Sequence, residues 1–235
     1  MSRKSKVPDE RKNEFIAVAE KLFLEKGYEQ TTIADIVQHM EVAHGLFYYY
    51  FKSKEDIIKA ITQNMFVEAE TRLRSLVNNK NLDVIEKLRI FIQEMAKLKM
   101  EKLYVVTYVL DEKNTLLVHM SLKLFIANLA PLFAELIEQG VKTNVFDTPS
   151  PKHASEFLFT GMFFLFFSNN AIDSRADWFE SIMAIADVWE RVLGAPKGSI
   201  ASIYQEISTT AEHMVSEIFK GKTNNINKQG DGGAT

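Results

Sequence analysis

The chain contains no cysteine, which excludes disulfides, thiolate metal sites and cysteine nucleophiles. It has only five histidines, and they form neither a His-Glu-x-x-His zinc motif nor the two Glu-x-x-His pairs of a di-iron bundle. The Gly-x-Ser-x-Gly motif of hydrolases and the glycine-rich phosphate loops of nucleotide-binding proteins are also absent. We therefore expect a protein that is not an enzyme and has no catalytic residue, no metal and no cofactor.

Long apolar runs are missing as well. No apolar segment follows the polar N-terminus, MSRKSKVPDERKNE, so we expect no signal peptide and a cytoplasmic chain. The longest apolar run, Phe157 to Phe167, has eleven residues. A membrane span needs roughly 20, so no membrane contact is expected. Because this run is apolar on every side, it must be buried in protein, and one of its sides can pack on a second subunit.

No segment shows the period-2 alternation of a β-strand, whereas helical spacing of apolar residues recurs along almost the whole chain. The expected fold class is therefore all-α. A first helix starts near Pro8 and ends before Gly27. Later helices are expected at 54–77, 83–99, 101–111, 115–139, 152–169, 177–193 and 199–220. Pro131 should kink or divide the long central helix.

The most informative stretch runs from Thr31 to Asp56, TTIADIVQHMEVAHGLFYYYFKSKED. It predicts a short helix with a capping box of Thr32 and Asp35, a turn at 41–43, and a second short helix before a new N-cap at Ser53. The apolar face of the first helix comprises Ile33, Ile36, Val37 and Met40, and that of the second comprises Ala43, Phe47 and Tyr50 or Phe51. Two short helices joined by such a turn form a helix-turn-helix, whose second helix enters the DNA major groove.

The side of the second helix away from its apolar face carries His44, Gly45, Tyr48 and Tyr49. Glycine costs about 1 kcal/mol relative to alanine inside a helix, so close approach to DNA would explain Gly45. Tyrosine hydroxyls can donate to phosphate oxygens, and Lys52 and Lys54 can neutralise the same strand. The alternative is a three-helix corner with an aromatic core. However, the five aromatic residues at 47–51 cannot all be buried on one short helix, because neighbours diverge by about 100°.

Residues 27–56 resemble the N-terminal domain of the TetR (tetracycline repressor) family of bacterial transcriptional regulators. The matching features are Gly-Tyr at 27–28, Thr-Thr-Ile at 31–33, Val42, Gly45, Phe47-Tyr48 and the run Tyr50-Phe51-Lys52-Ser53-Lys54-Glu55. The resemblance implies that Thr32, Tyr48, Tyr49 and Lys54 contact phosphates, and that His44, Gly45 and Leu46 face base edges. It also implies a homodimer that is formed through the C-terminal helices and an effector pocket in the larger domain.

Three residues depart from the family's pattern. Glu41 stands where the family commonly has Gly in the turn, Ala43 where it has a Ser or Thr cap, and Leu46 where Thr is frequent. Loss of the cap should cost the recognition helix about 1 kcal/mol. Leu46 can instead contact a thymine methyl group. These changes affect the expected operator sequence more than they affect the expectation that the domain binds DNA.

The charge of the chain is not that of a strongly basic DNA-binding protein. The net charge is −3, and residues 1–54 hold nine Lys and Arg against eight Asp and Glu. The first twelve residues are more basic, with five cations against two anions. This segment is either an arm that seeks phosphates or a solvated terminus.

An effector site is expected among the helices around 104–110 and 116–133. Seventeen Phe and nine Met indicate a mostly apolar effector, although most of these residues also suit a core. The polar side chains there that can orient an effector are Tyr104, Thr107, Tyr108, His119 and Asn128. Each of them separately also suits a hydrogen-bonded core or surface position.

Together these expectations describe three parts of the chain. Residues 1–54 form a helix-turn-helix DNA-binding domain, 55–220 a helical effector-binding and dimerisation domain, and 221–235 a disordered tail. The expected protein is a homodimeric, ligand-responsive transcriptional repressor, which binds a palindromic double-stranded DNA operator and is released by a small apolar effector. The alternative is a helical hydrophobe- or lipid-binding protein that has kept the N-terminal fold but lost operator binding.

Overall fold

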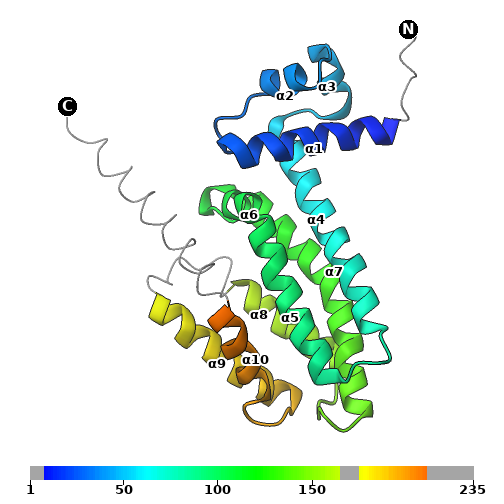
Figure 1. The fold of residues 1–235 in the computed structure, drawn as a ribbon, viewed down its shortest axis with the longest axis vertical. Coiled ribbons are helices and arrows are strands. Elements are labelled where there is room, and N and C mark those ends of the chain that lie inside the picture. Colours follow the sequence, from blue (N-terminus) through cyan, green and yellow to red (C-terminus); the bar gives the residue numbers. More distant parts are fainter. Residues whose placement is uncertain (1–7, 165–174, 211–235) are drawn as a thin grey trace, which may run out of the picture.

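A computed structural model describes residues 8–164 and 175–210 of the chain, and within these ranges the chain forms helices and loops without a strand (Figure 1). The first helices are α1 (Pro8–Lys26), α2 (Ile33–His39), α3 (His44–Tyr50), α4 (Lys54–Val77) and α5 (Val84–Glu101). They are followed by α6 (Leu103–Val109), the 3₁₀ turn η1 (Glu112–Asn114), α7 (Thr115–Lys142), α8 (Pro151–Phe163), α9 (Arg175–Leu193) and α10 (Ser199–Thr210). The all-α prediction is confirmed. The predicted tail at 221–235 lies outside the described residues.

The N-terminal helices α1, α2 and α3 pack around a small apolar core together with the first turns of α4. Phe15, Phe47 and Ile57 are fully buried in this core, and the Phe15 and Phe47 rings meet edge-on at 5.9 Å. The Thr31 hydroxyl donates to the Gly27 carbonyl at 2.8 Å and so fixes the loop between α1 and α2. These contacts hold α3 at one end of the molecule (Figure 1).

Helix α4 connects this bundle to the larger part of the protein. Its residues up to Ile61 belong to the N-terminal core, and those from Met65 onward belong to a second, larger core. Two residues of α6, Val105 and Val109, are buried on the N-terminal side as well. The two cores therefore meet inside α4 and at α6, and the domain boundary at residue 54 stays a prediction.

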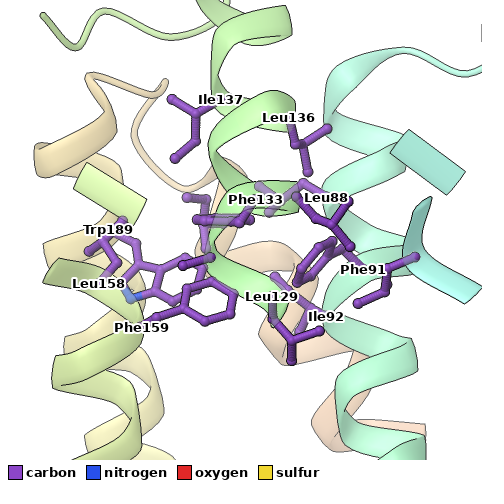
Figure 2. Packing of buried hydrophobic residues seen from close by; sticks show 14 of the residues in the cluster. Leu88, Phe91, Ile92, Leu129, Phe133, Leu136, Ile137, Leu158, Phe159 and Trp189 are labelled. Atoms are coloured by element: carbon purple, nitrogen blue, oxygen red, sulfur yellow. The ribbon is translucent and has the colours of Figure 1, made fainter. Parts of the chain in front are cut away.

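The larger core is centred on α7. The Phe133 ring lies 5.3 Å from that of Phe91 in α5, 5.1 Å from that of Phe159 in α8 and 5.1 Å from that of Trp189 in α9, and Figure 2 shows these side chains converging. By length and composition alone, α7 is also able to cross a membrane. Its fully buried residues Leu129, Leu132, Phe133, Leu136 and Ile137 instead make it the central core helix of this fold.

Helix α7 runs without interruption through Pro131, so the proline does not divide this helix, and the alternative, a kink at the proline, stays a prediction. Proline costs a helix about 3 kcal/mol, because it removes one backbone donor and crowds the preceding turn. The neighbouring residues Leu129 and Leu132 are fully buried, and their burial offsets that cost. The Ser155 hydroxyl of α8 adds a hydrogen bond to the Ala130 carbonyl at 2.7 Å.

Helix α10 is held by a buried carboxylate. Glu190 of α9 accepts hydrogen bonds from the backbone N–H groups of Gly198, Ile200 and Ala201, at 2.8, 2.9 and 3.0 Å. These are donors at the start of α10 that have no partner within the helix, and a negative charge is favourable at that end. Glu190 therefore has a structural role.

Candidate DNA-binding surface and effector cavity

The start of α2 is fixed by the predicted capping box. The Thr32 hydroxyl accepts a hydrogen bond from the Asp35 backbone N–H at 3.1 Å, and the Asp35 carboxylate accepts one from the Thr32 N–H at 2.7 Å. Lys26 at the end of α1 lies 2.8 Å from the same carboxylate. The Lys26 ammonium and the Thr32 donors hold the pKa of Asp35 well below its usual range.

The turn between α2 and α3 shows what two of the sequence departures cost. Glu41 adopts φ of +53°, a left-handed conformation that favours glycine over a residue with a Cβ atom. Ala43 occupies the N-cap of α3, and no side-chain hydrogen bond caps that end. Helix α3 is therefore positioned by its packing, and neither the turn nor the cap is optimised locally.

Helix α3 turns one side chain inward and a polar face outward. Phe47 is fully buried, whereas Tyr48 is 53% exposed and Tyr49 is 73% exposed. His44 and Gly45 are also exposed on this outer face. A Cβ atom at Gly45 would have no neighbouring atom within 4 Å, so the packing of the chain gives no reason for glycine here.

The remaining residues predicted to contact DNA lie around α3 in different environments. Thr32 and Lys52 are exposed, and Leu46 is half-buried. The Lys54 ammonium donates to the Tyr28 carbonyl at 2.7 Å and lies 4.0 Å from the centre of the Tyr28 ring. Burial lowers the pKa of Lys54. Lys54 thus joins α4 to the loop after α1, and its phosphate contact stays a prediction.

Helix α6 contacts the N-terminal bundle through its polar side chains. The Glu20 carboxylate of α1 accepts hydrogen bonds from Lys102 at 2.5 Å and from the Tyr104 hydroxyl at 3.0 Å. The Tyr108 ring lies 3.8 Å from the ring of Tyr28, which also carries the Lys54 contact. Burial, followed by the hydrogen bond with Tyr108, raises the pKa of Tyr28. Two residues predicted to bind an effector, Tyr104 and Tyr108, therefore belong to the joint between the two cores.

Helix α6 also borders a cavity in the larger domain. The cavity lies among α4, α5, α6, α7 and α8, and its empty volume is about 480 Å³ when the solvent at its opening is included. Its described lining is formed by Thr62, Met65, Phe66, Met95, Leu98, Lys99, Val105, Val106, Val109, Leu110, Ser121, Phe125 and Phe163. Only Thr62, Lys99 and Ser121 among these residues are polar, so the cavity suits a mostly apolar molecule.

None of the five residues predicted to bind an effector is in this described lining, and their contact with an effector stays a prediction. Tyr104 and Tyr108 contact the N-terminal bundle. Thr107 and His119 are exposed, and the Asn128 amide donates to the Leu124 carbonyl at 2.7 Å. The five residues were chosen because their side chains are polar, without regard to the side of the helix on which each one lies. Ser121 lies between Leu117 and Phe125 at a spacing of four, and that apolar stripe is the signal that would have identified it.

Helices α8 and α9 expose an apolar surface. Phe157 is 66% exposed and Phe164 is 49% exposed, and they flank Gly161 at helical spacing on α8. A Cβ atom at Gly161 would meet no atom within 4 Å. Val188 of α9 is exposed as well. The part of the apolar run at 165–167 lies outside the described residues.

Comparison with known proteins assigns the N-terminal part of the chain. Residues 15–61 match the family model described as bacterial regulatory proteins, tetR family. HbdR of Aromatoleum sp. (strain CIB), an HTH-type transcriptional regulator, is 42% identical over 60 residues, which are 26% of each chain. YfiR of Bacillus subtilis (strain 168), an uncharacterized regulator of the same type, is 26% identical over 141 residues, 56% of this chain and 68% of YfiR. The matched stretch thus spans only about a quarter of HbdR.

The fold of the larger domain also has counterparts among solved structures. The structure of RolR in complex with resorcinol aligns with a TM-score of 0.61 and 16% identity, covering 83% of this chain and 93% of RolR. An identity this low establishes the fold alone. The curated relatives are transcriptional regulators and not enzymes. The N-terminal residues 15–61 of this chain are therefore a helix-turn-helix segment of the tetR family of bacterial regulatory proteins, and the helices that follow have the fold seen in RolR.

Proposed function

We propose that the chain is a homodimeric repressor that binds a palindromic operator through α3 and is released when a small apolar effector enters the cavity beside α6. The outward face of α3 carries this proposal. His44, Tyr48 and Tyr49 are exposed there, and Gly45 has no role in the packing of the chain. A helix that presents side chains and a bare backbone to solvent, behind a turn, suits the major groove.

The exposed apolar surface of α8 and α9 supports the homodimer. A second copy of the chain would bury Phe157 and Phe164, and Gly161 between them would allow close approach of a helix backbone. Two α3 helices spaced by about 34–36 Å would then occupy successive major grooves. Gly161→Leu should block that approach and convert the dimer to a monomer in sedimentation equilibrium, whereas Ala17→Leu, on the exposed side of α1, should leave the dimer intact. A dimer that persists in Gly161→Leu would exclude this surface.

Helix α6 supports the response to an effector. Val105 and Val109 line the cavity, and Tyr108 on the same helix contacts Tyr28 of the N-terminal bundle. An effector that displaces α6 would therefore alter the position of that bundle and the spacing of the two α3 helices. It can shift the occupancy of the operator only by its difference in affinity for the two arrangements.

The first experiment is a selection of random double-stranded DNA with the purified chain, from which bound effector has been removed, followed by titration at two salt concentrations. A palindromic winner that binds at about 10⁻⁸ M or tighter, and more weakly as salt rises, is expected. Affinity that stays at the non-specific level of about 10⁻⁴–10⁻⁶ M for all sequences would favour the hydrophobe-binding alternative.

The winning sequence then allows the phosphate contacts and the regulatory direction to be tested. Tyr48→Phe and Tyr49→Phe should each weaken operator binding, because each removes one hydroxyl donor. Unchanged affinity and salt dependence in both variants would reject the phosphate assignment. A reporter with the operator between promoter and gene should be expressed less when the chain is present, and increased expression would make the protein an activator.

A further inference from the structure

One hydroxyl beside the cavity lacks a partner. Ser121 in the second turn of α7 is 3% exposed, and its Oγ atom makes no hydrogen bond in the part of the chain that the structure describes. A buried polar atom without a partner is unfavourable, so a reason for its retention is needed. Ser121 lines the cavity together with Phe125, one turn further along the same helix.

Other hydroxyl groups in these helices donate a hydrogen bond to a backbone carbonyl of the preceding turn. The Thr62 hydroxyl, also in the cavity wall, donates to the Ile58 carbonyl at 2.8 Å, one turn back in α4. Thr160 in α8 donates to the Glu156 carbonyl at 2.7 Å in the same way. Such bonds to the preceding turn are normal for Ser and Thr in helices. Ser121 does not make one, so its hydrogen-bonding capacity is directed elsewhere.

The cavity wall restricts what Ser121 can meet. In the described lining Thr62, Lys99 and Ser121 are polar, and the other residues are apolar. The Thr62 hydroxyl already donates its proton inside α4. A molecule that fills the cavity must therefore be mostly apolar, and a single polar group on it can use the unsatisfied Ser121 Oγ atom as its partner.

We propose that the cavity binds a small apolar molecule that carries a single hydroxyl or carbonyl group, and that this group hydrogen-bonds to Ser121 Oγ. This inference rests on the proposed effector response and specifies the ligand class of the same site. The apolar body of the ligand lies against Phe66, Phe125 and the valines of α6. Ser121 then determines specificity by orientation, while the apolar wall supplies most of the affinity.

Two probes of matched shape test the ligand class by calorimetry on the full chain: 4-ethylphenol and ethylbenzene. We expect 4-ethylphenol to bind more tightly than ethylbenzene, because only the phenol can hydrogen-bond to Ser121. Equal or tighter binding of ethylbenzene would overturn the proposal. Failure of both probes to bind up to their solubility limits would do the same.

Two variants test the role of Ser121 separately from the fold. Ser121→Ala should reduce the affinity for 4-ethylphenol by about 5–10-fold, the worth of one hydrogen bond, and leave ethylbenzene unaffected. Thr160→Val is the matched control, and it should leave both affinities within about twofold, because Thr160 is not in the described lining and its proton is used inside α8. An equal loss of affinity for both probes in Ser121→Ala would indicate that Ser121 only shapes the cavity. No loss of affinity for either probe would reject Ser121 as the hydrogen-bond partner. Operator binding, measured in the same samples without any probe, reports on the proposed DNA-binding function independently.

Discussion

Helices α3 and α6 are both seven residues long, and neither has a side-chain hydrogen bond at its N-cap, yet their surroundings differ. Helix α3 buries Phe47 and exposes most of its other side chains. Helix α6 is enclosed, with Val105 fully buried and Tyr104 and Tyr108 in contact with the N-terminal bundle. Helices this short are not stable alone, so packing decides their position. A change on the outer face of α3 should thus alter binding alone, whereas a change in α6 should affect both cores.

The largest expected effect comes from removing the single anchor of α3. Phe47→Ala should destabilise the protein by about 3–5 kcal/mol, because a fully buried aromatic ring is lost and a cavity is left behind. Urea unfolding measured by circular dichroism gives this value. Tyr49→Ala is the control, since the side chain is mostly exposed and its loss should change stability by no more than about 0.5 kcal/mol. Equal destabilisation by both changes would contradict the description of α3 as a helix with one buried face and one exposed face.

A change at the joint between the two cores should separate operator affinity from the effector response. Tyr108→Leu keeps an apolar side chain but removes the ring that contacts Tyr28. Operator affinity without effector should change little, because α3 is distant from this contact along the bundle. The shift in operator affinity caused by an effector, typically about 5–150-fold in coupled systems, should shrink toward onefold. Titrations of operator with and without effector measure it, and an undiminished shift would exclude this joint as the route.

The same comparison explains which features the sequence allowed us to predict. The helices, the capping box at Thr32 and the outward face of α3 follow from spacing between near neighbours, which a sequence displays directly. The orientation of α6 depends on residues far away in sequence, such as Glu20 and Tyr28. Tyr104 and Tyr108 therefore resembled effector contacts, although they connect the two cores.

The continuity of α7 and the role of Ser121 could not be predicted for a related reason. Proline in a helix is unfavourable by local rules, and only the burial of residues on both sides of Pro131 shows that the helix continues. A serine among leucines and phenylalanines resembles an ordinary core position. Only the packed structure shows that its hydroxyl borders a cavity and has no hydrogen-bond partner among the described residues.

Gly45→Ala should produce opposite effects on stability and binding. Alanine is favoured over glycine inside a helix by about 1 kcal/mol, and its methyl group would meet no atom within 4 Å, so the protein should become more stable. The same methyl group would stand between the α3 backbone and DNA, so operator affinity should fall. Chemical unfolding and operator titration of one sample measure both quantities. A variant that is stabilised and binds the operator as tightly as before would show that α3 does not approach DNA closely at this point.

The smallest effect is expected at the cap of α2, which has the side-chain hydrogen bonds that the N-caps of α3 and α6 lack. Because the pKa of Asp35 is lowered in the folded protein, its carboxylate stabilises the fold above the unfolded pKa of about 3.9, and this contribution is lost as pH falls through the lower folded value. Asp35→Asn retains an oxygen that can accept the cap hydrogen bond but removes the charge that pairs with Lys26. The stability difference between the parent protein and this variant should therefore shrink as pH falls from 6 toward 2 in urea unfolding. A difference that stays constant over this range would mean that hydrogen bonding alone, and not the ion pair with Lys26, fixes the start of α2.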